Sequence, residues 1–88
     1  MSPEERRRRG TKLCAKIAAD VKELAPTGIG NWPECWDIVG DADAGFMLAL
    51  VKWEGTGSEA DKESVRTAYA RVLDAWRKAV SAWEAIEA

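Results

Sequence analysis

One long stretch, residues 58–87, constrains the fold more than any other, because it contains neither glycine nor proline and its apolar residues recur every three or four positions. At about 100° per residue, this spacing puts them on one face of an α-helix. Ser58 precedes Asp61 by three residues, a pattern typical of a helix start. The apolar face is too broad for one neighbour, so the sequence predicts a long amphipathic helix lying across several others. That face holds Val65, Tyr69, Val72, Trp76, Ala79, Trp83 and Ile86.

Turn signals divide the rest of the chain into three further helices. Ser2 and Pro3 begin a helix over residues 3–25, and Pro26 ends it. Pro33 opens a short helix over residues 33–39, which Gly40 ends. A third helix follows over residues 44–54, capped at its start by Asp41 or Asp43 and at its end by Gly55. The prediction is therefore an all-α, four-helix domain spanning residues 1–88, with residues 1–10 as a solvated or frayed basic end.

The third predicted helix is apolar around its whole circumference, so it is either buried or shared with a partner. The chain also has five tryptophans, a residue type common in cores and at binding sites. Trp53, Trp76 and Trp83 lie among core positions, and Trp32 and Trp36 are placed to stack on one another. The candidate partner-binding residues are Trp32, Trp36, Met47 and Leu48.

Charge is unevenly distributed along the chain. Residues 1–16 carry six basic and two acidic groups, a net +4, whereas residues 17–58 carry two basic and seven acidic groups, a net −5. The basic end suggests contact with nucleic acid or with an acidic protein surface. No aromatic residue is interleaved with it to stack on bases, and the acidic middle would repel a polyanion. The candidate contact residues are Arg6, Arg7, Arg8, Arg9, Lys12 and Lys16.

Little in the sequence points to catalysis, a metal or a cofactor. Histidine is absent, and two cysteines without histidine make a poor metal site. The run from Asp41 to Gly45 resembles the start of a calcium loop, but Lys52 stands where the twelfth-position glutamate should be. We therefore expect no catalytic residues, no metal, no cofactor and no small-molecule ligand. We find no secretory signal and no membrane span, so we expect a cytoplasmic protein with reduced thiols, Cys14 being a small core residue.

The tripeptide Trp53-Glu54-Gly55 resembles the W-x-G turn of the WXG100 family, small secreted helical hairpins. The resemblance covers three residues and the central turn, and it implies a secreted helical protein. The chain departs from the family pattern in two places. Its first half is interrupted between Pro26 and Pro33, and Leu73 stands where the family's C-terminal signal has an acidic residue four positions after Tyr69.

The function predicted from these features is a non-enzymatic protein-binding module. Its partner is another protein, a second copy of itself, or both, and its role is that of an inhibitor, an adaptor or an accessory subunit. Regulators encoded by phages and mobile elements often have this build, which is an analogy only. The alternatives are a nucleic-acid-binding regulator that uses the basic first helix and, with less support, a WXG100-like secreted protein.

Overall fold

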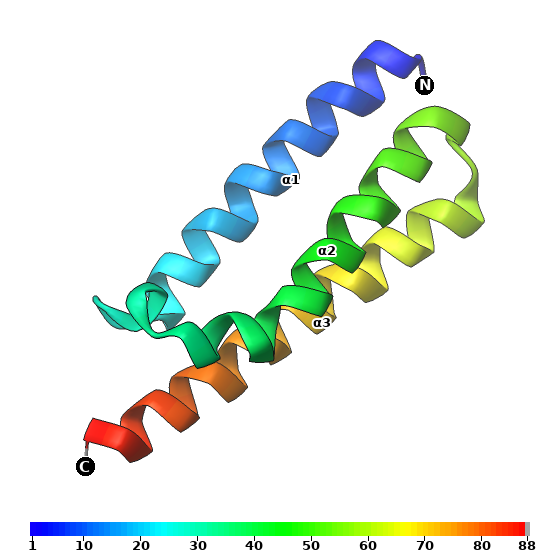
Figure 1. The fold of residues 1–88 in the computed structure, drawn as a ribbon. Helices are drawn as coiled ribbons and strands as arrows, with labels where there is room; N and C mark the ends of the chain where they lie inside the picture. Colours follow the sequence, from blue (N-terminus) through cyan, green and yellow to red (C-terminus); the bar gives the residue numbers. More distant parts are fainter. Residues whose placement is uncertain (88) are drawn as a thin grey trace.

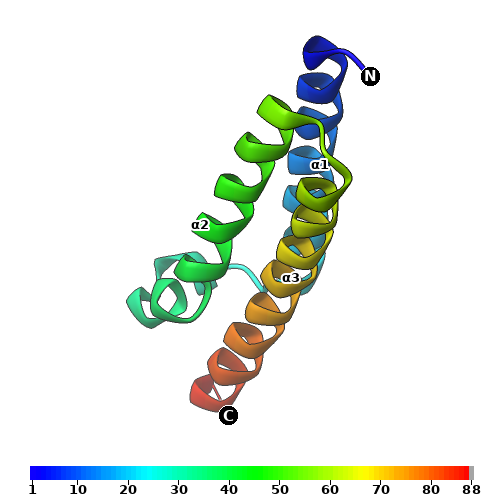
Figure 2. The same ribbon diagram turned by 90° about the vertical axis from the view of Figure 1, so that its right-hand side faces the viewer.

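The computed structural model describes residues 1–87 as three long helices and one short turn of 3₁₀ helix. Helix α1 spans Pro3–Leu24, η1 spans Ile29–Asn31, α2 spans Pro33–Thr56 and α3 spans Glu59–Glu87. As Figure 1 shows, α2 runs antiparallel to both α1 and α3, and the N-terminus and residue 87 lie at opposite ends of a rod about 49 Å long. Figure 2 shows the three helices side by side, with α1 behind α3.

The all-α prediction is confirmed, but the four-helix count is wrong. The helices predicted over residues 33–39 and 44–54 are one continuous helix, α2, which passes through Gly40 and Gly45 without a break. A glycine inside a helix costs roughly 1 kcal/mol relative to alanine. Val39 and Phe46, on either side of these glycines, are almost completely buried in the core. Tertiary packing therefore overrides the local signal.

The continuity of α2 also changes the roles predicted for three cap residues. Asp41 and Asp43 cap no helix, because they lie in the middle of α2 with exposed side chains. Gly55 is still helical. The residue that ends α2 is Gly57, whose φ of 64° lies in the left-handed region and whose N–H donates to the Trp53 carbonyl at 2.7 Å.

Two of the four predicted helix starts are confirmed by side-chain hydrogen bonds. The Ser2 hydroxyl accepts from the Glu5 N–H at 3.2 Å, at the start of α1. The Ser58 hydroxyl accepts from the Asp61 N–H at 3.1 Å, at the start of α3. Each bond satisfies a backbone donor that the first turn of a helix leaves free.

The core lies between α2 and α3 and is completed by one face of α1 and by Ile29 of η1. Trp53 and Trp76 are buried, as predicted, and Trp83 is partly buried against the same cluster. Tyr69, also predicted to be core, is half-buried, and its hydroxyl donates to the Asp20 carboxylate. The buried set is Ile17, Ile29, Cys35, Val39, Phe46, Leu50, Trp53, Val65, Val72, Ala75, Trp76 and Ala79.

The first turns of α1, expected to be a solvated end, are helical and contact the far end of α2. Arg6 Nε donates to the Glu54 carbonyl at 3.0 Å, and its guanidinium lies over Gly57. One turn later, Gly10 is buried, and a Cβ built on it would lie 3.4 Å from Leu50 Cδ1 and against the Glu54 carboxylate. The helix dipole also favours a positively charged guanidinium at the carbonyl end of α2.

Over residues 1–87, none of the helices combines the length and the apolar character that crossing a bilayer requires.

Candidate functional site

Of the six large hydrophobic residues that are exposed among residues 1–87, four lie on α2, and the other two, Met1 and Ile86, lie near the chain ends. Trp36 is 50% exposed, Met47 47%, Val51 63% and Leu48 73%. By helical spacing, Leu48 and Val51 lie on the side of α2 turned away from its core face, and Trp36 and Met47 lie between that side and the core face. We call these four residues the α2 stripe. Single exposed apolar residues are ordinary, but four on one helix face mark a surface that suits a protein partner.

The sequence produces this stripe because α2 is apolar on two opposite sides. Its inner side supplies Cys35, Val39, Phe46, Leu50 and Trp53 to the core, all at most 7% exposed. Those residues already meet α3 and α1, so the remaining apolar side chains have no helix of this chain to cover them. The apolar helix was expected to be either buried or shared with a partner. One side of α2 is buried in the core, and the other side is exposed.

A groove of about 250 Å³ runs beside the stripe, between α1 and α2. Its α1 wall is formed by Cys14, Ala18 and Val21, and its α2 wall includes Trp36 and Met47. Cys14 is therefore a half-buried groove residue rather than a fully buried core residue. The groove extends the apolar surface from the α2 stripe onto α1.

Trp36 is held in place although it is half exposed. Its indole N–H donates to the Gly30 carbonyl at 3.1 Å, and its ring meets Trp76 edge-on, with 5.8 Å between ring centroids. An anchored aromatic side chain offers contact area at low cost in conformational entropy. The partner of Trp36 in the fold is thus Trp76 of α3 and not Trp32, the residue we expected it to stack on.

Trp32 lies apart from the α2 stripe. Its ring packs at a tilt against Trp83, with 5.6 Å between centroids, and the residue is partly buried. Within the described residues, the buried Nε1 of Trp83 has no hydrogen-bond partner. Of the four predicted partner-binding residues, the structure therefore brings Trp36, Met47 and Leu48 onto one helix face and places Trp32 in a separate tryptophan pair.

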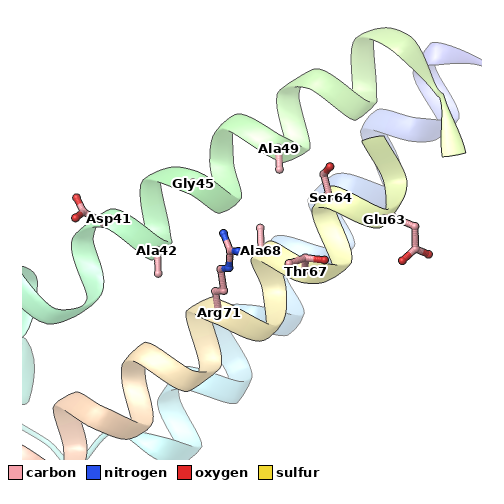
Figure 3. Close-up of a pocket in the computed structure, with 9 residues that line it drawn as sticks. All are labelled: Asp41, Ala42, Gly45, Ala49, Glu63, Ser64, Thr67, Ala68 and Arg71. Carbon is pink, nitrogen blue, oxygen red and sulfur yellow. The ribbon is translucent and has the colours of Figure 1, made fainter. Parts of the chain in front are cut away.

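A second hollow, of about 460 Å³, lies on the other side of α2, where α2 faces α3. Figure 3 shows Ala42 and Ala49 turned toward α3 and the Arg71 side chain reaching toward α2, whereas Asp41 and Glu63 point away from the hollow. This trough is shallow and mixed in character, with one guanidinium and no large apolar side chain in its lining. It suits a polar contact at the edge of an interface better than an apolar anchor.

Acidic side chains surround the first half of the α2 stripe. Asp37, Asp41 and Asp43 are all exposed, and Asp43 also lines the groove beside Trp36. Lys52 is the only basic residue of α2, and its ammonium lies 3.7 Å from Asp61 Oδ1. The stripe therefore has an acidic rim at one end.

The six candidate basic residues of α1 do not form one free surface. Arg6 is bound to the end of α2, Arg9 lies 3.8 Å from the Glu5 carboxylate, and the Lys16 ammonium lies 5.5 Å from the centre of the Tyr69 ring. Arg7, Arg8 and Lys12 are exposed.

The pKa values of Asp61, Tyr69 and Cys35 are shifted, and none of these side chains lies on the α2 stripe. Hydrogen bonds from Thr56 and Ser58 lower the pKa of Asp61, with a smaller contribution from Lys52. The hydrogen bond to Asp20 raises the pKa of Tyr69. Burial raises the pKa of the Cys35 thiol, which disfavours the thiolate. Over residues 1–87, His, Cys, Asp and Glu side chains form no group of three that could hold a metal ion.

The sequence reasoning missed Val51 and the α1 wall of the groove. Val51 follows Met47 by four residues and Leu48 by three, so helical spacing alone could have added it to the partner-binding set. The groove depends on how closely α1 approaches α2 at Gly10, and no local sequence pattern predicts that distance.

Comparison with known proteins yields no match to a family model, to a curated protein or to a solved structure.

Proposed function

We propose that this chain is a non-enzymatic protein-binding module whose docking surface is the α2 stripe together with the groove beside it. The partner surface is apolar at its centre and basic at its edge, to match the stripe and its acidic rim. The observation that carries the proposal is the exposure of Leu48 and Val51, at 73% and 63%, on the same helix as the anchored, half-exposed Trp36. An apolar centre that includes aromatic residues and methionine is usual in an interface.

A module of this kind works by occupying another protein's surface. With a rigid rod of three helices behind it, the α2 stripe is presented in one fixed shape, which reduces the entropy cost of binding. The roles that suit it are those of an inhibitor, an adaptor or an accessory subunit. The side chains with shifted pKa values lie in the turn, the core and the α1–α3 contact, and the proposal does not need them.

The test is a pair of charge substitutions on two exposed surfaces. Leu48→Glu puts a carboxylate in the centre of the stripe, and Ala70→Glu puts the same group at an exposed position of α3. Tagged wild type and both variants are cross-linked in the cells that produce the protein, and the captured partners are quantified. We expect Leu48→Glu to lose its partner and Ala70→Glu to keep it, with both variants as helical as wild type by circular dichroism. Equal capture by both variants would refute the proposal.

A second candidate is nucleic-acid binding through α1, favoured by the exposure of Arg7, Arg8 and Lys12 on one helix. The substitutions Arg7→Gln, Arg8→Gln and Arg9→Gln, made together, remove this charge while leaving Arg6 in its structural contact. Each lost phosphate contact lowers the slope of log affinity against log salt by about 0.9. If this candidate holds, the triple variant binds a DNA duplex more weakly than wild type and with a shallower salt dependence. Unchanged binding, or no binding by wild type at moderate salt, would eliminate it.

A further inference from the structure

Building on the proposed function, we propose that the α2 stripe binds a second copy of this chain. The two copies lie antiparallel about a two-fold axis that passes near Met47 and Leu48, so that α2 packs against α2 of the partner subunit. Three features of α1 and α2 support this arrangement: the distribution of charge, the apolar surface and the spacing of small residues.

Opposite charges lie at opposite ends of the stripe. The first half of α2 contains Glu34, Asp37, Asp41 and Asp43 and no basic residue. The other end of the rod carries the arginine run of α1, fixed there because Arg6 Nε donates to the carbonyl of Glu54. The first half of α2 is thus acidic, and the start of α1, beside the other end of the apolar surface, is basic, with four arginines against Glu4 and Glu5.

Arg7 is the arginine that faces the same side as the groove. It precedes Cys14 by seven residues and Ala18 by eleven, so helical spacing puts all three on one face of α1. Cys14 and Ala18 line the groove, and Gly10 lies against Leu50. Arg7, nearly one turn before Gly10, is therefore level with the last turns of α2, beside the end of the stripe.

A two-fold axis across the stripe brings the basic end of one copy to the acidic end of the other. Arg7 then lies near Asp43 of the partner subunit, and the contact occurs twice. A parallel pairing would set acidic end against acidic end and basic end against basic end. Charge complementarity therefore selects the antiparallel arrangement, and two-fold symmetry closes it as a dimer.

The backbone of α2 also leaves room for close approach. Gly40, Ala44 and Gly55 lie along the stripe by helical spacing, between its larger side chains. A Cβ built on Gly40 or on Gly55 meets no atom within 4 Å, so packing within residues 1–87 does not require glycine at either position. Glycine weakens a helix relative to alanine, and small residues let two helices pack at a short distance. A second α2 packed on the stripe accounts for them.

The experiment uses sedimentation equilibrium of the full chain. We expect wild type to dimerise at high micromolar concentration, and Leu48→Glu to weaken the dimer by roughly 30-fold or more, the size of a hot-spot loss. The matched control Ala70→Glu should dimerise like wild type. A monomeric wild type, or equal weakening by Leu48→Glu and Ala70→Glu, would overturn the proposal.

A charge exchange tests the antiparallel geometry. Arg7→Glu and Asp43→Lys should each dimerise more weakly than wild type, because each variant faces like charge in its partner. Mixed in equal amounts, the two variants regain wild-type affinity as a heterodimer, since both of its contacts pair opposite charges. A mixture that stays as weak as its components would overturn the arrangement. High salt should reduce the difference, since screening shortens the range of these contacts.

The two proposals fail in different ways. If wild type is monomeric but still captures another protein, and Leu48→Glu abolishes that capture, the proposed dimer is wrong and the protein-binding function stands. If wild type is monomeric and capture is also indifferent to Leu48→Glu, both are wrong.

Discussion

The inner and outer faces of α2 have similar side chains and opposite surroundings. Phe46 and Leu50 on the inner face are 2% and 3% exposed, whereas Leu48 and Val51 on the outer face are 73% and 63% exposed. One short stretch of chain supplies both sets. The difference shows that α2 carries more apolar side chains than the core of one copy of this chain buries.

The largest difference between the two faces is expected when adjacent residues, one on each face, are truncated to alanine. Phe46→Ala should cost about 3–5 kcal/mol of unfolding free energy, because it empties a buried site that the rigid neighbours cannot fill. Met47→Ala should change the monomer by no more than about 0.5 kcal/mol. Urea denaturation at low protein concentration, where the monomer dominates, measures both. Comparable losses would mean that the outer face is structural.

A bulky residue at Gly10 tests how closely α1 must approach the inner side of α2. Gly10→Leu forces side-chain atoms against Leu50 and Glu54, and overpacking of this kind typically costs about 1–3 kcal/mol. The same substitution at Gly30, where a Cβ meets nothing within 4 Å, is the control. In thermal melts, Gly10→Leu should unfold at a much lower temperature than Gly30→Leu. A Gly10→Leu variant as stable as the control would show that α1 is held only loosely.

The glycines inside α2 should respond in the opposite direction. Gly45 lies in the helix interior with open space around its Cα, so Gly45→Ala should stabilise the monomer by about 0.5–1 kcal/mol through helix propensity alone. A higher melting temperature at low protein concentration would show this. A loss of stability would mean that α2 needs flexibility at Gly45, contrary to the continuous helix described above.

The smallest expected effect concerns Asp61, in the turn that joins α2 to α3. Its pKa in the folded state is lowered by hydrogen bonds from Thr56 and Ser58, so ionised Asp61 stabilises the fold above its unfolded pKa, near 3.8. That contribution is lost as pH falls through the lowered folded value. Asp61→Asn should therefore be less stable than wild type at neutral pH, and the gap should close in acid.

Melting curves of wild type and Asp61→Asn across this acidic range provide the measurement. A gap that stays constant into strong acid would show that the charge of Asp61 contributes nothing. Asp41→Asn, at an exposed position in the middle of α2, is the matched control, and its melting temperature at neutral pH should stay close to that of wild type.

Local signals were sufficient wherever one helix face and one cap decided the structure. The start of α3 and its apolar face were predictable because Ser58 caps a stretch with unbroken helical spacing. The middle of the chain was not, because the cost of Gly40 and Gly45 had to be weighed against the burial of Val39 and Phe46, which only the assembled helices reveal.

The same limit applies to the candidate site. Met47 and Leu48 could be predicted because a helix that is apolar around its whole circumference must be buried or covered by a partner on every side. The groove could not, because it depends on the register between α1 and α2, which Gly10 and Arg6 set by contacts some 40 or more residues apart in the sequence. The role of Arg6 could not be predicted either, since nothing in a run of four arginines distinguishes the one that ends up bound.

The short turn at Gly57 also implies an order of folding. Only residues 57–58 separate α2 from α3, whereas residues 25–32 separate α1 from α2, so the contacts between α2 and α3 close the shorter loop. Contacts between near neighbours in sequence form at a lower cost in chain entropy. The α2–α3 hairpin should therefore form first and open last. Native-state hydrogen exchange would show this as slower exchange of the buried amides in those two helices than of any in α1.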